Sequence, residues 1–174
     1  MPTPYNPYEL PDMAATGGKL PVIAVDTRDR VDPLVFHRCP WAWRTMPSGD
    51  YSAVGLERVL AFERKKIGDF IACCYAERER FVAELERLRG YDYAAVMIQG
   101  TRGEIERGEF RSRGTPQSIL ASMDAFEMAF RVPFYFFPTA DEMARRIEVL
   151  TCRFVRGQAK RWAGIEMREP EAAK

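Results

Sequence analysis

The stretch GDYSAVGLERVLAFERKKIGDF, residues 49–70, predicts a β-hairpin that leads directly into a helix. Residues 51–54 and residues 59–65 are short runs rich in apolar and β-branched or aromatic side chains, as in strands. Residues 55–58 form the expected turn between them, because this segment begins with glycine. A hairpin fixes two antiparallel neighbours in a sheet, so the remaining elements can be arranged around it.

Charged side chains are expected to gather at one end of this hairpin. Successive residues of a strand alternate between the two faces of a sheet, so Glu63 and Lys65 share one face. Leu60 and Phe62 share the opposite face, where they are expected to meet a layer of helices. Asp50 precedes the partner strand and can reach the same spot as Glu63 and Lys65.

Two more carboxylates are expected near this cluster, because Asp26 ends an earlier predicted strand and Asp69 lies in the first turn of the helix. Several oxygen ligands without histidine suit a hard cation such as Mg²⁺ or Mn²⁺. A nearby lysine can orient water or stabilise negative charge on a phosphate. The cluster therefore favours metal-assisted phosphodiester hydrolysis. The alternative is a solvated salt-bridge patch, which is common at strand ends.

The rest of the chain completes an α/β pattern, and the fold class that we predict is a three-layer αβα sandwich around a central mixed β-sheet. Apolar runs and helical stripes give the remaining elements. The predicted strands cover residues 20–25, 34–36, 41–46, 94–98 and 133–137, and the predicted helices cover residues 67–89, 119–130 and 143–154. Residues 1–19 are expected to be a flexible segment, residues 20–156 one domain and residues 157–174 a basic, polar tail that frays.

Composition limits the class of protein. A chain of 174 residues that is 47% hydrophobic and 29% charged suits one globular domain. The net charge of +1 means that any DNA-binding surface must be local. The four cysteines show no metal-ligand spacing, and a single histidine excludes a site built from several histidines. Without a signal peptide or a long apolar run, we expect a cytoplasmic protein with no membrane partner.

The motif around the hairpin resembles that of a known nuclease family. VDTR at residues 25–28, GD at residues 49–50 and ERKKIGD at residues 63–69 resemble the G-D…E-R-K-x-x-x-D pattern of XPF-type (ERCC4-domain) nucleases. That family belongs to the PD-(D/E)xK superfamily and has a restriction-endonuclease-like core. The resemblance runs from about residue 22 to residue 154, and the short chain also resembles stand-alone phage or prophage members.

The resemblance implies a role for each motif residue. Asp50 and Glu63 would bind Mg²⁺ or Mn²⁺, Asp26 would assist as a further metal-binding carboxylate, and Lys65 would position the attacking water or the phosphate. Three further motif residues would have supporting roles: Arg64 and Asp69 would hold the site together, and Arg28 would contact DNA. The implied substrate is branched, flapped or junction DNA.

Two positions depart from the family pattern. Asp29 stands where the family often has glutamate, and Gln99 precedes Gly100 where the family often has glutamate and glycine. These changes put the efficiency or the metal preference in doubt more than the core chemistry. The helix-hairpin-helix modules that usually follow such domains are not recognisable after Phe154. Junction targeting is therefore expected to come from the domain itself, from a dimer or from another protein.

Other segments are candidates for contacts with DNA. An arginine-rich and glycine-rich loop covers residues 101–116, and its candidate DNA-binding residues are Arg102, Arg111 and Arg113. The alternative is a solvated loop, since nearby glutamates almost cancel the charge. Trp41 and Trp43 share one strand face and could stack on an unpaired base, although large aromatic residues more often pack in a core or an interface.

The predicted function is a Mg²⁺- or Mn²⁺-dependent DNA endonuclease. The family also contains catalytically silent DNA-binding or scaffold partners, but the intact motif argues against that reading. A Holliday-junction resolvase-like cutter on the same core would differ only in its substrate. The resemblance also implies a homodimer through the last predicted strand and helix, residues 133–154.

Overall fold

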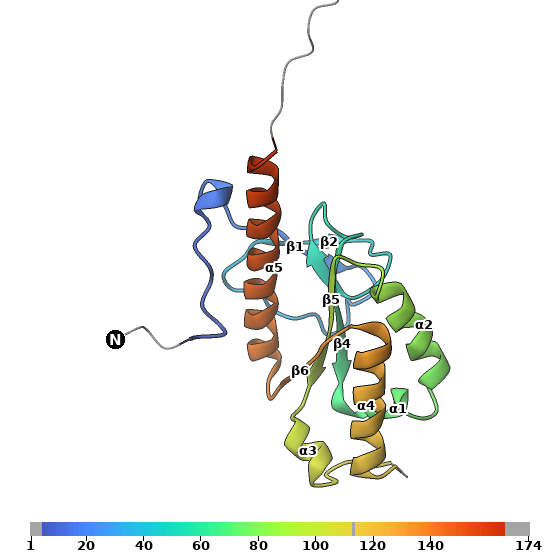
Figure 1. The fold of residues 1–174 in the computed structure, drawn as a ribbon. Helices are drawn as coiled ribbons and strands as arrows, with labels where there is room; N and C mark the ends of the chain where they lie inside the picture. The colour runs from blue at the N-terminus through green and yellow to red at the C-terminus, as the bar shows by residue number, and fades with distance from the viewer. Residues whose placement is uncertain (1–4, 113, 166–174) are drawn as a thin grey trace, which may run out of the picture.

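A six-stranded sheet forms the centre of the molecule in the computed structural model, which describes residues 5–112 and 114–165 (Figure 1). The strands lie in the order β2-β1-β3-β4-β5-β6. Their bounds are β1 (Ile23–Asp26), β2 (Trp41–Arg44), β3 (Tyr51–Ala53), β4 (Leu60–Lys66), β5 (Tyr93–Gln99) and β6 (Phe134–Phe137). The helices are η1 (Ala14–Thr16), α1 (Ile67–Cys73), α2 (Arg78–Leu88), α3 (Arg102–Glu106), α4 (Pro116–Phe130) and α5 (Ala140–Ala163).

The direction of the strands places many strand ends along one edge of the sheet. β3 is antiparallel to β1 and to β4, while the pairs β1–β2, β4–β5 and β5–β6 are parallel. The carboxyl ends of the five parallel strands therefore lie at the same edge as the beginning of β3. The predicted hairpin and mixed sheet are confirmed.

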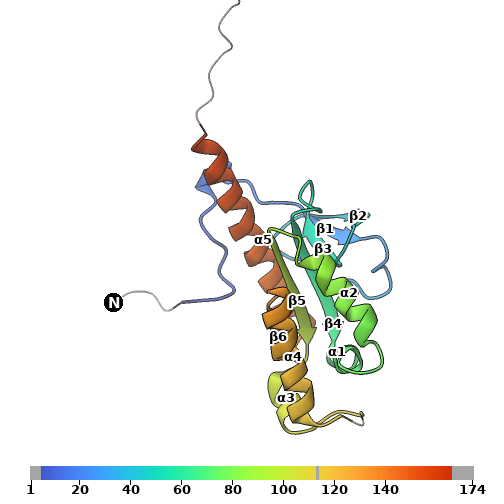
Figure 2. The same ribbon diagram turned by 45° about the vertical axis from the view of Figure 1, so that its right-hand side comes forward.

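Helices cover both faces of the sheet and complete the three-layer αβα sandwich. α1, α2 and α4 lie on one face and α5 lies on the other, as the turned view shows (Figure 2). The alternation of β4 sorts its side chains between the two layers. Leu60 and Phe62 pack in the α5 layer, whereas Ala61 packs with α1, α2 and α4. The predicted faces of this strand are thus confirmed.

The helix predicted over residues 67–89 is wrong in one respect, because the chain turns between α1 and α2. Neither glycine nor proline marks this turn, so the local sequence contains no stop signal. Contacts with α4 accompany it. The hydroxyl of Tyr75 lies 2.5 Å from that of Ser118, and the Arg78 guanidinium lies 4.6 Å from the centre of the Phe126 ring.

Three other segments also differ from the expectation. Residues 34–36 form no strand; Leu34 and Phe36 are buried in a loop that packs on the α5 layer. The loop after β5 contains the short helix α3, whose Thr101 cap forms a reciprocal capping box with Glu104. α5 continues to Ala163, beyond the expected end near Phe154, with basic residues in its last turn.

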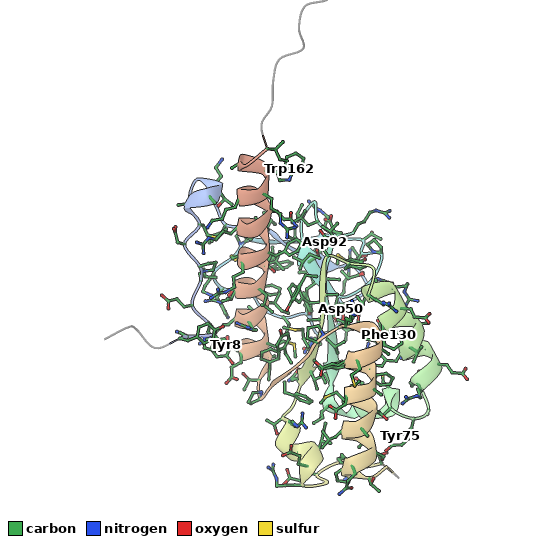
Figure 3. The ribbon with its side chains drawn as sticks, in the orientation of Figure 1. Tyr8, Asp50, Tyr75, Asp92, Phe130 and Trp162 are labelled. Atoms are coloured by element: carbon green, nitrogen blue, oxygen red, sulfur yellow. The ribbon has the colours of Figure 1, made fainter. Side chains whose placement is uncertain are left out.

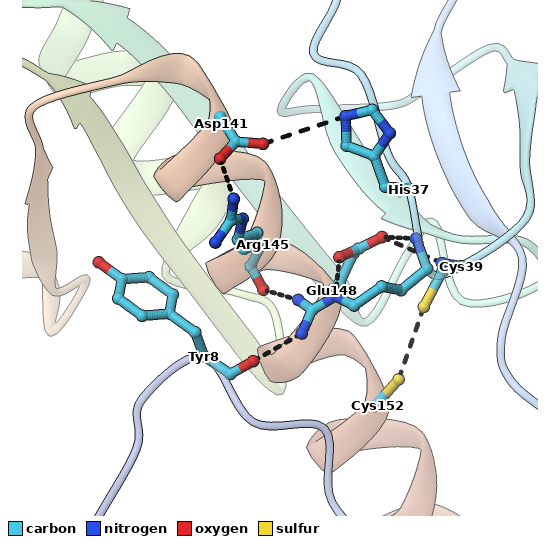
Figure 4. A network of polar contacts seen from close by, with 8 residues as sticks. Tyr8, His37, Cys39, Asp141, Arg145, Glu148 and Cys152 are labelled. Carbon is cyan, nitrogen blue, oxygen red and sulfur yellow. Dashed lines mark hydrogen bonds and ion pairs between the residues drawn. The ribbon is translucent and has the colours of Figure 1, made fainter.

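A buried ion pair fastens the segment before β2 to α5 (Figure 4). Glu148 of α5 is 1% exposed and accepts hydrogen bonds from the backbone N–H groups of Arg38 and Cys39 and from Arg38 Nε. The Arg38 guanidinium also donates to the carbonyl of Tyr8, so the N-terminal segment is tied to the same helix. Among the residues that the structure describes, no helix is long and apolar enough to span a membrane.

Candidate active site

The predicted catalytic residues meet where the carboxyl end of β4 lies beside the beginning of β3. An open cleft of about 370 Å³ occupies this edge, and Asp50, Glu63, Lys65 and Asp69 all line it. Figure 3 labels Asp50, which lies near the middle of the view. Ligands of open α/β sheets commonly bind outside the carboxyl ends of the strands, so the position of the cleft is the expected one.

Backbone pairing brings the Asp50 carboxylate next to β4. The Asp50 N–H donates to the carbonyl of Phe62 at 2.9 Å, and Asp50 Oδ2 accepts from the Arg64 N–H at 2.8 Å. Its Oδ1 accepts no hydrogen bond from the described residues. Glu63 lies between these two partners in sequence and is only 4% exposed. The register of the hairpin therefore places two carboxylates side by side.

Lys65 neutralises part of this charge. Its ammonium group contacts Glu63 Oε1 and lies 3.2 Å from Glu84 Oε2 of α2. It also lies 5.7 Å from the centre of the Phe81 ring, so α2 holds the lysine from above the sheet. Burial lowers the pKa of Lys65, but the charges of Glu63 and Glu84 outweigh this effect and raise it. Lys65 is therefore a fixed positive charge at the cleft.

For the two carboxylates, in contrast to Lys65, the surroundings disfavour the charged form. Burial raises the pKa of Asp50 to about 6, against the lowering effect of the Arg64 N–H and the charge of Lys65. Burial also raises the pKa of Glu63 well above its ordinary value, and the charge of Asp50 adds to the effect. Ionising both carboxylates costs free energy unless a bound cation neutralises part of their negative charge.

Arg64 also lines the cleft. Its side chain, on the opposite face from Glu63, contacts the carbonyl of Asp32 and lies 3.2 Å from Asp32 Oδ2. It also donates to Gln99 Oε1 at 3.0 Å. Gln99 therefore serves as a partner of Arg64, and its neutral amide satisfies one of the arginine donors. Asp69 lines the cleft from the first turn of α1.

Asp26 is not grouped with the two cleft carboxylates. It is fully buried and forms an ion pair with Arg28, whose Nη2 lies 2.5 Å from Asp26 Oδ2. Burial raises the pKa of Asp26, but its hydrogen bonds with Arg28 outweigh this and lower it. The Asp26 N–H donates to the Asp50 carbonyl at 2.9 Å, so Asp26 fixes the position of the Asp50 backbone.

The expected metal ligands are only partly assembled. Within residues 5–112 and 114–165, no three Asp, Glu, His or Cys side chains are grouped closely enough to form a metal site. The set of Asp26, Asp50 and Glu63 is therefore not brought together. Asp50 and Glu63 fit a hard cation by the chemistry of their oxygens, because both line the cleft and the charge of Asp50 raises the electrostatic cost of ionising Glu63.

Sequence reasoning missed two carboxylates at the site. Glu84 of α2 contacts Lys65, and Asp29, noted only as a departure from the family pattern, lines the cleft and accepts from the Tyr51 hydroxyl at 2.5 Å. The sequence did contain a signal for Glu84: it lies three residues after Phe81 on the predicted helix, so both side chains share the face that points towards the sheet. Asp29 offered none, because its position depends on how the loop after β1 folds back.

Three of the predicted DNA-contacting arginines lie in described segments that follow β1 and β5. Arg102 begins α3 and pairs with Glu106 at 3.0 Å, and Arg111 is exposed in the following loop. Arg113 lies outside the described residues. Arg28 is exposed beside the cleft, where the charges of Asp26, Asp50 and Glu63 raise its pKa.

Comparison with known proteins shows the fold. The sequence matches no family model and no curated protein. It is similar to a solved structure of XPF from Aeropyrum pernix, with 20% identity and a TM-score of 0.69 over 88% of this chain and 70% of that chain. A second structure, XPF from Aeropyrum pernix in complex with DNA, gives 19% identity and a TM-score of 0.56 over 82% of this chain and 64% of that chain.

Neither comparison supports the expected phage origin. The likeness covers the mixed sheet and the helices on both of its faces, which carry the cleft. Similarity at about 20% sequence identity shows a shared fold and nothing finer. The chain therefore has the restriction-endonuclease-like fold of the XPF nuclease.

Proposed function

We propose that the chain is a divalent-metal-dependent endonuclease that hydrolyses phosphodiester bonds in branched, flapped or junction DNA. One observation carries the proposal: Asp50, Glu63 and Lys65 line one open cleft, where the buried carboxylate of Glu63 lies next to the half-buried carboxylate of Asp50. A salt-bridge patch on the surface would not bury its charges. The fold shared with XPF supports the reaction class.

Each residue would have a distinct part in hydrolysis. Asp50 and Glu63 would hold Mg²⁺ or Mn²⁺, which supplies a Lewis acid for the phosphate and lowers the pKa of a bound water. Lys65, kept protonated by Glu63 and Glu84, would orient the attacking water or stabilise charge on the phosphate oxygens. Water adds to phosphorus and the bond to the leaving oxygen breaks; one proton of the water ends on the leaving oxygen as a hydroxyl group, and the other passes to solvent as the phosphate monoester ionises. Asp26 would support the backbone of Asp50.

DNA would lie along the edge that holds the cleft. Arg28, Arg102 and Arg111 belong to three segments near this edge and are proposed to contact phosphates. A structure of XPF in complex with DNA has the same fold, which supports DNA as the ligand. We also propose a homodimer through β6, an edge strand, and the adjacent part of α5, where Leu150 and Phe154 are half-buried.

The function is tested by cleavage of labelled flap, fork, four-way and linear duplex DNA with Mg²⁺, Mn²⁺, Ca²⁺ or excess EDTA. We expect cleavage of at least one branched substrate with Mg²⁺ or Mn²⁺ and little with Ca²⁺. Asp50→Asn should abolish cleavage, while Asp124→Asn, at an exposed position on α4, should not. Full activity in EDTA, or an Asp50→Asn variant as active as the wild type, would refute the proposal.

Two other outcomes identify the alternatives. A protein that binds branched DNA but cuts none of these substrates with any of the metals would be a silent scaffold partner. Cleavage confined to the four-way junction would indicate a resolvase-like cutter. Light scattering tests the dimer separately, because a monomer at micromolar concentration would contradict it.

A further inference from the structure

The outer edge of the sheet carries two tryptophans that the cleft does not use. β2 is an edge strand, and Trp41 and Trp43 lie on the same face of it, opposite Ile23 and Val25 of β1. Their rings meet edge to face, with centres 5.4 Å apart. Trp43 packs partly on the core, but Trp41 is 44% exposed. Core packing therefore accounts for Trp43 and not for Trp41.

Positive charge flanks these rings. The Arg30 guanidinium lies 5.5 Å from the centre of the Trp43 ring, and Arg44 ends β2. Both arginines are exposed, and neither forms an ion pair with another residue that the structure describes. The edge thus combines flat aromatic surface with uncompensated cations. This combination attracts an anionic ligand that also has flat apolar faces.

The surface adjoins the cleft through the loop after β1. Asp29 and Val31 line the cleft, while Arg30, which lies between them, turns onto Trp43. The strand ends give a second link, because Arg44 lies opposite Asp26 in the register of the β1–β2 pair, and the Asp26 N–H donates to the Asp50 carbonyl. Neighbouring strands lie about 4.8 Å apart, so the end of β2 lies about 10 Å from the beginning of β3.

We propose that this β2 surface, formed by Trp41, Trp43, Arg30 and Arg44, binds single-stranded DNA that leaves the cleft. The inference rests on the proposed function, because it assigns the unpaired part of the substrate to a place on the molecule. A few nucleotides of an unpaired strand bridge about 10 Å, because each one adds at least the 3.4 Å rise between stacked bases. Unpaired bases can stack on Trp41, whereas a duplex keeps its bases stacked on one another.

A second copy of the chain is the competing occupant, since an edge strand has free backbone groups that could pair with another β2. In a twofold, antiparallel pairing Arg44 of one copy would lie across from Trp41 of the other, and the uncompensated cations Arg30 and Arg44 of both copies would gather along one seam. The like charges would repel one another without a carboxylate to offset them. Charge therefore favours the nucleic acid.

The test compares Trp41→Ala with Trp162→Ala, which removes a tryptophan that is 67% exposed near the end of α5 (Figure 3). Binding of a fluorescent 15-nucleotide oligo(dT) and of a blunt duplex is measured by anisotropy in EDTA. We expect Trp41→Ala to weaken oligo(dT) binding about 5- to 100-fold, because one stacked base contributes about 1–3 kcal/mol. Duplex binding should change little, and Trp162→Ala should bind both ligands as the wild type does.

Further readouts separate the possible results. In a Trp162→Phe background, oligo(dT) should quench the remaining tryptophan fluorescence. Equal affinity of Trp41→Ala and the wild type for oligo(dT), or a Trp41→Ala variant that dissociates a dimer without a change in DNA binding, would overturn the proposal. Because binding is measured without metal, it does not depend on cleavage. A protein that cuts DNA but binds oligo(dT) without Trp41 would refute this inference alone.

Discussion

At the scale of single residues, the fold places the carboxyl groups of Asp50 and Glu63 where their ionised forms are disfavoured. Both are shielded from water, which disfavours their ionisation, and the charge of Asp50 further disfavours ionisation of Glu63. The positive charge of Lys65, which contacts Glu63, offsets part of this negative charge. Residues with strongly shifted pKa values often gather where catalysis occurs, since the fold gives up stability to keep them charged. Two predictions follow from this arrangement.

Asp50→Asn is expected to stabilise the metal-free protein at pH 7. An unfolded aspartate ionises near pH 4, whereas Asp50 in the folded chain ionises near pH 6. Between these values ionisation favours the unfolded state, so the stability contributed by protonated Asp50 is lost as the pH rises from about 4 to 6. At 1.36 kcal/mol per pKa unit the upper limit is about 3 kcal/mol, and we expect a gain of about 1–2 kcal/mol.

Urea unfolding in EDTA at pH 4.5 and at pH 7 measures this gain. The wild type should lose more stability than Asp50→Asn between the two pH values, and Mg²⁺ should stabilise only the wild type. Asp124→Asn is the control, at an exposed position. A variant whose pH dependence matches that of the wild type would show that Asp50 is not desolvated.

Lys65→Met is expected to separate metal binding from turnover. Methionine keeps the apolar part of the side chain against Phe81 but removes the charge near Glu63 and Glu84. Losing one electrostatic contact to a reacting group typically costs about 10²–10³ in rate. Cleavage should fall by that amount while Mg²⁺ still binds, as measured by calorimetry. A variant with unchanged cleavage would exclude Lys65 from the reaction.

At the scale of elements, α5 is joined to the segment before β2 by a buried ion pair. Glu148 has three donors from Arg38 and Cys39, so removing its charge leaves those donors poorly satisfied. We expect Glu148→Gln to lower the free energy of unfolding by about 2–3 kcal/mol. Asp141→Asn breaks an exposed pair with Arg145 and should change it by less than about 0.5 kcal/mol. Chemical denaturation of the two variants provides the comparison, and equal stabilities would contradict the prediction.

At the scale of the whole molecule, one edge of the sheet carries the cleft, the β2 surface at one side and the α3 loop at the other. Five strands end at this edge, so segments that lie far apart in the sequence can contact one extended ligand. The net charge of +1 gives no sign of this local arrangement, because it sums charges over the whole chain.

Arg111→Ala tests whether the loop after α3 takes part in binding DNA. If Arg111 neutralises one phosphate, its loss should reduce the slope of log affinity against log salt by about one unit for all sequences. Filter binding of duplex DNA over a series of salt concentrations measures the slope. Arg107→Ala is the control, since Arg107 already pairs with Glu109 at 2.6 Å. An unchanged slope for Arg111→Ala would identify the loop as solvated surface.

The hairpin, the αβα sandwich with its mixed sheet, and the shared face of Glu63 and Lys65 were predictable from the sequence alone. These features follow from local patterns, namely the alternation of a strand, the spacing of a helix and the chemistry of a turn. Asp50 was also predictable as a neighbour of Glu63, because a hairpin fixes its own register.

The partners of these residues depend on the tertiary fold. Asp26 pairs with Arg28 rather than joining the cleft carboxylates, Glu84 reaches Lys65 from another element, and the predicted helix over residues 67–89 turns against α4. Each of these outcomes depends on contacts between elements that are distant in sequence. Such contacts depend on how whole faces pack, and local periodicity carries no information about which side chain lies opposite which.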